Sequence, residues 1–365
     1  MAAPSDYRHD PFSDVSTAAT FTERHIIPSV SPYVINLNEI PQKNSPSTMT
    51  VKAITNVNGS TVTYGSTFAE VAANPSSNEF WPDYNTGADG DENWNTGKLL
   101  FNSSNAGQLV EIRYTATGTL AGVKSNRYPA WWLDRGDGSD GDFAPTANTT
   151  ISGFKQYKSV YIPAGVTVTV YRWTVLQCQG AFVVEGTLTA NGQGAIGGSE
   201  SGGTGSNEYA YASFGGAGGR GEAGEAGGAG GGLGIGGLAQ DVNAIYIYKN
   251  IIIAFGGGGG GGSNGKAGGP GGAGGNGGGC IYIIAPEVKI TGSVTANGNA
   301  GGAGISAGLG TGGGGGGGGG GCVTIIAHVL NSGIVTAYGG SGGLGGGTGA
   351  TGGTGLVHIE ELGVV

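Results

Sequence analysis

The residue cluster with the clearest chemical potential is the acidic stretch DRGDGSDGD at 134–142. Closely spaced carboxylates can hold Ca²⁺, but an EF-hand loop needs carboxylates at alternate positions and a closing Glu, and this spacing does not match. The stretch also contains Arg135, Gly136 and Asp137, an integrin-type tripeptide. We interpret it as a solvated turn, with a metal-stabilised loop and a receptor tripeptide as the alternatives.

The histidines do not form a catalytic group. His9, His25, His328 and His358 are scattered along the chain, and none accompanies a nucleophile and an orienting acid. GxGxxG matches are numerous in a chain with 83 Gly residues, but no strand, glycine loop and amphipathic helix surround them. We therefore predict that the protein is not an enzyme and has no catalytic residues, no cofactor and no bound metal.

Charge and targeting signals narrow the class of function. The net charge of −9 and the lack of basic runs argue against nucleic-acid binding. The longest apolar stretch, 244–255, is too short for a membrane span. Residues 1–12 include Asp6, Arg8 and Asp10 and lack the apolar segment of a secretion signal, so we expect synthesis in a cytoplasm.

Period-two alternation of β-branched and aromatic residues predicts strands in the first half. The segments are 33–40, 49–57, 60–65, 98–102 and 108–118. No segment has a 3.6-residue amphipathic pattern, so we predict an all-β protein with essentially no α-helix. We expect a polar arm at 1–28, a small antiparallel β-sandwich that serves as an attachment module at 29–122, and a junction at 123–151.

Strands resume at 152–198 and then recur as a repeat. Residues 280–298 align with 322–339, which is one residue shorter, and more loosely with 178–192. No His, Asp or Glu keeps register with the cysteine that opens each copy, so we predict a buried core position repeated in a stack rather than a metal or redox site. The three cysteines are Cys178, Cys280 and Cys322.

Glycine runs with a period of three fill much of 199–365. Residues 265–279 read GKA-GGP-GGA-GGN-GGG, and 215–229 keep the same phase. This is the period of the polyproline-II helix, whose backbone N–H and C=O groups point sideways without internal partners. This half holds only two prolines, which excludes collagen. We predict a layered polyglycine-II bundle bracketed by strands, with structural glycines at Gly256, Gly259, Gly272 and Gly316.

The chain reversals at the ends of the glycine runs are candidates for recognition, because variable loops on a rigid scaffold often bind partners. The loop 199–214 carries aromatic residues flanked by Ser, Gly and Asn, a mixture that binding surfaces favour. An alternative is that these aromatic side chains fold back onto the scaffold. The predicted receptor-binding residues are Asn207, Glu208, Tyr209, Tyr211 and Phe214.

The glycine-rich half resembles the polyglycine-sandwich adhesins that cap the long tail fibres of T-even-like bacteriophages, through the phasing at 215–229 and 265–279 and the bracketing strands. The strings YIPAGVTVTV (161–170) and VEGTLTANG (184–192) before a glycine-rich tail are similar to phage fibre and tail proteins, and 36–118 resembles a small β module of such proteins. The resemblance implies a non-enzymatic tail-fibre or tail-tip component that presents a rigid body to a host-surface receptor, either protein or glycan.

The same resemblance implies partners and a location. The N-terminal half would bind other virion tail proteins, and the chain would be a homo-oligomer or a cap on an oligomeric fibre. It would be made in the host cytoplasm without a signal peptide and reside in the virion tail, with no nucleic-acid partner and no membrane insertion. The alternatives are a bacterial extracellular filament or adhesin subunit, a capsid fibre or decoration protein, and an ice-binding protein, which requires a regular Thr or Ala array.

Overall fold

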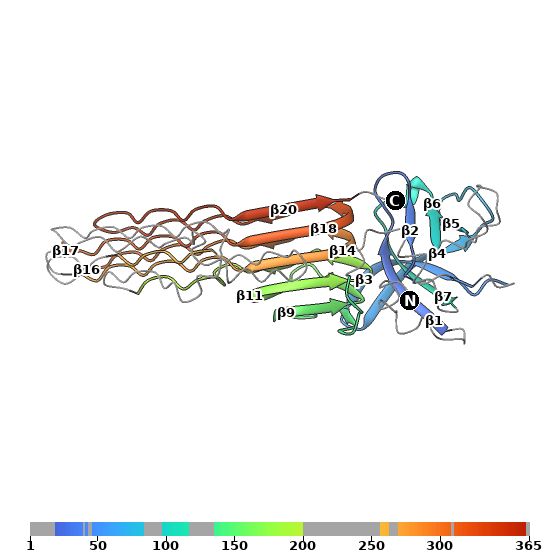
Figure 1. Cartoon of the computed structure of the whole chain (residues 1–365), viewed down its shortest axis with the longest axis horizontal. Helices are drawn as coiled ribbons and strands as arrows, with labels where there is room; N and C mark the ends of the chain where they lie inside the picture. Colours follow the sequence, from blue (N-terminus) through green and yellow to red (C-terminus); the bar gives the residue numbers. More distant parts are fainter. Residues whose placement is uncertain are drawn as a thin grey trace, which may run out of the picture.

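The computed structural model of the chain describes residues 19–38, 41–42, 46–83, 97–116, 135–199, 256–262, 269–307 and 310–362. Three parts follow one another along the long axis in Figure 1: a curled sheet at one end, parallel strands in the middle and glycine-rich segments at the other end. Within these ranges the regular elements are β-strands and one 3-10 turn at Ser103–Asn105. The all-β prediction is confirmed.

The N-terminal part is a seven-stranded sheet with the order β1-β7-β3-β4-β5-β6-β2, antiparallel except for the β4–β5 pair. Alternate residues of β7, such as Val110, Ile112 and Tyr114, point into a core that also holds Phe80 and Leu99. The strands are β1 (Ala19–Ile26), β2 (Val34–Asn36), β3 (Thr50–Asn58), β4 (Thr61–Glu70), β5 (Glu79–Asp83), β6 (Lys98–Phe101) and β7 (Leu109–Ala116).

Two of these strands depart from the sequence analysis. Strand β1 lies inside the polar arm expected at 1–28, yet it pairs along its whole length with β7. Its charged residues make contacts with the middle part of the molecule, so the strand lacks the usual apolar alternation. Strand β5 contains Pro82, which has no backbone N–H and therefore weakens a strand prediction.

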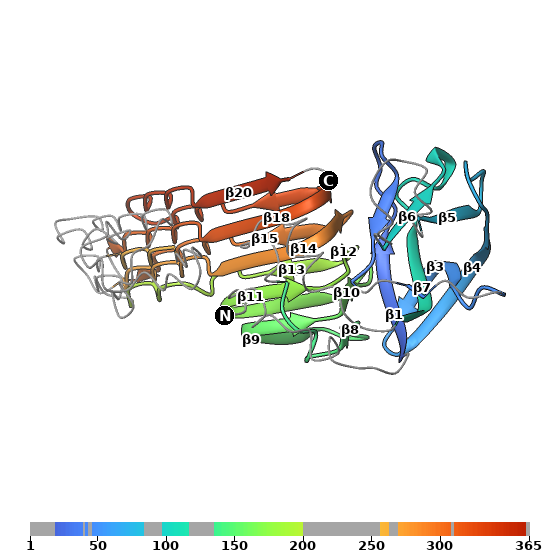
Figure 2. The ribbon, with the colours of Figure 1, turned by 45° about the vertical axis from the view of Figure 1, so that its right-hand side comes forward.

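The middle part is a β-solenoid, in which rungs of short strands stack in parallel register (Figures 1 and 2). Its three faces are the ladders β9-β11-β14-β18-β20, β8-β10-β12-β14-β18 and β11-β13-β15-β19. The strands are β8 (Asp142–Phe143), β9 (Thr149–Tyr157), β10 (Ser159–Ile162), β11 (Thr167–Cys178), β12 (Ala181–Val184), β13 (Thr187–Thr189), β14 (Cys280–Ile290), β15 (Ser293–Thr295), β18 (Cys322–Asn331), β19 (Ile334–Thr336) and β20 (Leu356–Glu361).

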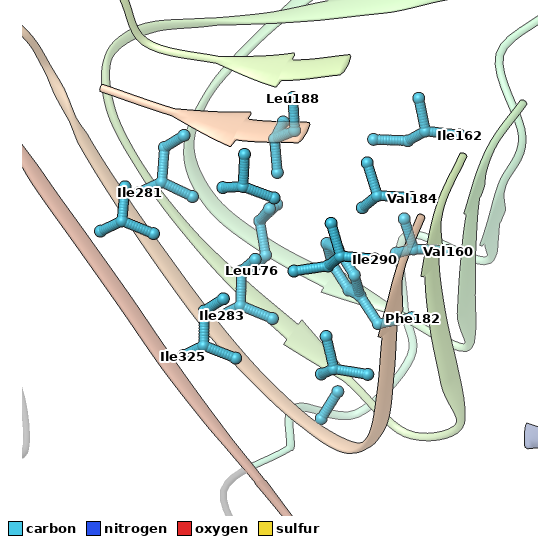
Figure 3. Close-up of a cluster of buried hydrophobic side chains, with 14 of the residues drawn as sticks. Val160, Ile162, Leu176, Phe182, Val184, Leu188, Ile281, Ile283, Ile290 and Ile325 are labelled. Atoms are coloured by element: carbon cyan, nitrogen blue, oxygen red, sulfur yellow. The ribbon is translucent and has the colours of Figure 1, made fainter. Parts of the chain in front are cut away.

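The solenoid core is a set of stacked apolar columns. Leu176, Ile283 and Ile325 occupy equivalent positions of successive rungs, and Phe182 lies above Val288 on the second face. Figure 3 shows Leu176, Ile283, Ile325 and Phe182 among the side chains that fill the interior between the faces. Each fully buried Leu, Ile or Val side chain contributes roughly 1.5–3 kcal/mol, so the stacking of rungs is a major source of stability.

The repeat at 280–298 and 322–339 corresponds to two stacked rungs, with Cys280 opposite Cys322. Cys178 does not belong to this column, which corrects the prediction that all three cysteines are equivalent. The partner of Cys280 on β11 is Trp173, and Cys178 lies five residues further along that strand. All three cysteines are buried. The alignment of 181–189 with 287–295 is confirmed by the strand pairing. The equivalence of Cys178 was wrong because β11 continues into the next turn without a strand break.

The glycine-rich segments are insertions at one corner of the solenoid, between the third face of one rung and the first face of the next. The chain turns this corner once in every rung. The first turn has no insertion, because β11 continues around the corner with a register shift between Val170 and Thr174, and Arg172 there has φ +63°. In the later rungs the same corner carries the insertions 190–279, 296–321 and 337–355. Their described parts extend together away from the curled sheet (Figure 2), and we call them the glycine arms.

The segment Gly312–Gly321 forms the centre of the arms and is buried along its whole length. Its N–H groups point in three directions with a period of three. Gly315, Gly318 and Gly321 donate to 296–302; Gly314, Gly317 and Gly320 donate to 347–353; and Gly316 and Gly319 donate to 257–260, at 2.7–2.9 Å. Its carbonyls accept from 272–278 and 340–346. The predicted polyglycine-II bundle is therefore present in the described residues.

Glycine is required wherever a backbone lies against a neighbouring backbone. A Cβ at Gly256, Gly259 or Gly272 would lie 2.0 Å from the carbonyl oxygen of Gly319, Gly316 or Gly302, respectively. Gly316, the fourth glycine singled out from the sequence, donates to Gly260 at 2.8 Å. Rows that face outward carry side chains instead, and their exposed residues recur every third position: Ala300 and Ala303, then Thr348, Thr351 and Thr354.

Replacing Gly272 by Val tests this packing. We expect a loss of about 3 kcal/mol or more of stability, because the new side chain must displace the Gly302 backbone and break its hydrogen bonds. Calorimetry of the purified variant measures the loss, and Ala350→Val, at an exposed position of the arms, is the control. A Gly272→Val variant that melts like the parent protein would contradict the packed arrangement.

Candidate functional surfaces

The curled sheet joins the solenoid through a buried charged cluster centred on His25 of β1. The side chain of His25 has no exposed surface, its Nδ1 lies 3.0 Å from Glu287 of the solenoid, and its Nε2 lies 2.8 Å from Glu23. Glu23 also accepts hydrogen bonds from the backbone N–H of Asn38 and from the hydroxyl of Tyr114. An imidazolium between two carboxylates therefore connects the two parts, and we call this contact the joint.

Polar contacts and apolar packing extend the joint around His25. Arg24 pairs with Glu111 on its own sheet at 3.2 Å and with Asp142 of the solenoid at 3.5 Å. Lys289 donates to the carbonyl of Gly107 at 3.1 Å. A Cβ at Gly180 would lie 2.3 Å from the Arg24 carbonyl oxygen, so the two backbones are in direct contact. The apolar residues of the joint are Ile26, Ile54, Val57, Tyr161, Ala181 and Val183.

The charge state of His25 follows from its partners. Burial alone disfavours the charged imidazolium, but the Glu287 carboxylate and the hydrogen bonds to Glu23 and Glu287 outweigh it, and they raise the pKa of His25 from 6.5 to about 10. His25 is thus a cation at neutral pH. Sequence analysis missed this role because Glu287 lies 262 residues away and nothing local indicates the pairing.

The acidic stretch 134–142, described from Arg135 onward, is a turn whose carboxylates bind the protein itself. Asp137 accepts from the N–H of Ser139 at 2.8 Å, and Asp140 accepts from the N–H of Gln156 at 2.7 Å. Hydrogen bonds from Ser139 hold the pKa of the Asp137 carboxyl below its usual value. Three glycines of this turn have φ between +70° and +75°, a conformation that side chains disfavour. This geometry agrees with the turn interpretation.

Two outward-facing columns of hydroxyl residues run along the third face of the solenoid. Alternate residues of the short strands point out while the middle residue of each points into the core. The hydroxyls hydrogen-bond along the columns, from Ser293 to Thr187 at 3.3 Å and from Thr295 to Thr189 at 2.9 Å. One column is Thr169, Thr189, Thr295 and Thr336, and the other is Thr167, Thr187 and Ser293, which is followed on the next rung by the exposed apolar residue Ile334.

The far end of the glycine arms carries a small hairpin. Strands β16 (Ser306–Ala307) and β17 (Gly310–Thr311) are antiparallel, and the hydroxyls of Ser306 and Thr311 lie 2.9 Å apart. Ile305 beside them is 55% exposed, so this reversal presents an apolar side chain and two hydroxyls to solvent. The predicted receptor-binding residues Asn207, Glu208, Tyr209, Tyr211 and Phe214 lie outside the described residues.

The remaining histidines are dispersed. His328 is buried in β18, His358 lies at the surface 3.7 Å from Glu360, and His9 is outside the described residues. No group of three His, Cys, Asp or Glu side chains in the described ranges has the geometry of a metal site. Among the residues that the structure describes, no helix has the length and apolar character needed to cross a membrane.

No family model, curated protein or solved structure matches the chain.

The joint should make stability depend on pH. The raised pKa of His25 means that its contribution is complete below pH 6.5 and is lost as the pH rises through about 10. We expect His25→Gln to remove this component, so that the stability difference between parent and variant shrinks from pH 6 to pH 10.5. Chemical denaturation measures the difference, with His358→Gln, at a surface position, as the control. A difference that is constant over this range would contradict a charged His25.

Proposed function

We propose that the protein is a non-enzymatic structural component of a phage virion, a tail-fibre or tail-tip protein that presents its glycine arms to a receptor on the host surface. The observation that carries this proposal is the common corner of the solenoid from which all the arms leave. Because the described parts of the arms extend together, the described strands β16 and β17 lie at the end of the molecule opposite the curled sheet (Figure 1). That arrangement separates an attachment end from a contact end.

The packing of the arms supports this proposal. A segment hydrogen-bonded to five others cannot bend on its own, so the reversals are held at a fixed distance from the solenoid. Loops on such a scaffold are free to vary without disturbing the fold. The hairpin at Ile305–Thr311 is one such reversal, and the predicted contact residues in 199–214 belong to another insertion at the same corner.

The joint supports a mechanical link between the two ends. His25, Arg24 and Lys289 fix the curled sheet against the solenoid by contacts that need both parts. A sheet bound to other tail proteins would then set the direction of the arms. In this proposal the curled sheet contacts the rest of the virion, the receptor is a surface protein or glycan, and the chain acts as a homo-oligomer or as the cap of an oligomeric fibre.

A second candidate function is ice binding, which the hydroxyl columns of the third face favour. Regular Thr spacing in two dimensions is what recognition of a crystalline surface requires, and one described column carries Thr on four rungs while the other carries hydroxyl residues on three. The hydrogen bonds between neighbouring hydroxyls also stabilise the ladder by themselves. A thermal-hysteresis measurement on the purified chain distinguishes the two candidates, since a tail protein should give none.

The contact end is tested by replacing Tyr209 and Tyr211 together with Ala. We expect the purified variant to lose at least about tenfold in its ability to block adsorption of the parent phage, because the aromatic area of the contact is removed. Tyr338→Ala is the matched control, since this tyrosine is 61% exposed at the base of the arms. Equal blocking by the double variant and the parent protein would remove these residues from the contact.

The location is tested by labelling lysate particles with gold-coupled antibodies to the purified chain. Label at the tail end supports the proposal. Label on the capsid, or on bacterial filaments in the absence of particles, would replace it with one of the alternative assignments.

A further inference from the structure

The chain holds two thiols side by side at the base of the glycine arms. Cys280 and Cys322 are opposite each other on the neighbouring parallel strands β14 and β18. Neighbouring strands lie about 4.8 Å apart, within the Cα separation of roughly 4.4–6.8 Å that a disulfide spans. Each cysteine directly follows the last residue of an arm, and the N–H of Cys322 donates to the Gly279 carbonyl at 2.9 Å, which holds the two strand starts together.

The two sulfur atoms share one environment. Their side chains face away from the solenoid interior and belong to an apolar cluster with Val175 and Tyr282, and each residue is 1% exposed. A hydrogen bond from Cys280 lowers the pKa of the Cys322 thiol despite the opposing effect of burial. The lowered pKa favours the thiolate form of Cys322, which is the form that acts as a nucleophile.

Cys178 provides an internal contrast. Its thiol points at backbone carbonyls, the nearest being that of Gly180 at 3.3 Å, and it has no cysteine at the equivalent position of the next rung. Burial raises the pKa of Cys178 to about 12, which keeps it protonated and unreactive. The chain therefore contains one pair of neighbouring thiols and one isolated thiol that serves as a control.

We propose that Cys280 and Cys322 form a disulfide when the folded protein meets a peroxide, and that this bond ties together the rungs from which the arms extend. The inference does not depend on the proposed function. It assigns a redox role to a position that the sequence indicated only as core packing.

The chemistry needs one peroxide per disulfide. The Cys322 thiolate attacks one oxygen of hydrogen peroxide, the O–O bond breaks, and the departing hydroxide takes up the proton released by the Cys322 thiol to give water. The product is a sulfenic acid at Cys322. The sulfur of Cys280 then attacks it, the S–O bond breaks, and the departing hydroxide takes the Cys280 proton as a second water. The two sulfur atoms lose two electrons, and the peroxide gains them.

The experiment counts thiols in the full folded chain. The purified protein is treated with hydrogen peroxide, and catalase then removes the remaining peroxide. The protein is unfolded and alkylated, and mass spectrometry of the intact chain counts the alkyl groups. We expect three alkyl groups before treatment and one after it, with peptide mapping that links Cys280 to Cys322. The Cys178→Ser variant should change from two alkyl groups to none, and reduction with dithiothreitol should restore both.

Three results would overturn the proposal. One is an unchanged count of three alkyl groups after treatment of the folded parent protein. Another is a crosslink that includes Cys178. The last is further oxidation of Cys322 to a sulfinic acid with no crosslink. Cys280→Ser should abolish the crosslink, and retention of it in this variant would likewise contradict the assigned pair.

Discussion

The structure depends on satisfying the backbone hydrogen bonds of segments that have almost no side chains. A glycine run exposes an N–H and a C=O at every residue, and leaving them unpaired in a buried position is costly. The arms meet this requirement by surrounding Gly312–Gly321 with five other segments. Each neighbour contacts one row of residues, which is why the period of the helix, three, becomes the period of the sequence.

The solenoid makes that arrangement possible because it fixes where each arm begins and ends. Arms inserted at one corner start in parallel register and are spaced like the rungs. The rungs therefore set the register in which the glycines of neighbouring arms pair. The apolar columns hold the rungs together, and the joint around His25 fixes the whole assembly against the curled sheet. This construction suits the proposed role, in which the ends of the glycine arms contact a receptor and the curled sheet attaches to other proteins.

The sequence predicted what depends on local pattern and missed what depends on distant pairing. The alternation of apolar and polar residues predicted β3, β6 and β7, and the three-residue period of glycine predicted the polyglycine bundle. Both patterns indicate which side of a segment is buried. The joint was missed because Glu23, Arg24 and His25 look like a solvated arm until Glu287 is placed beside them. The register of Cys178 was wrong because the corner at Arg172 carries no insertion, so two rungs merge into one strand in the sequence.

Amide hydrogen exchange along the glycine arms tests the central claim most directly. The account predicts strong protection at 314–321 and, in the outer segment 347–355, protection that recurs every third residue at Gly349, Gly352 and Gly355, whose N–H groups donate to the neighbouring segment. Exchange of these amides at the rates of an unstructured chain would show that the glycines do not form a hydrogen-bonded scaffold, and would contradict the account.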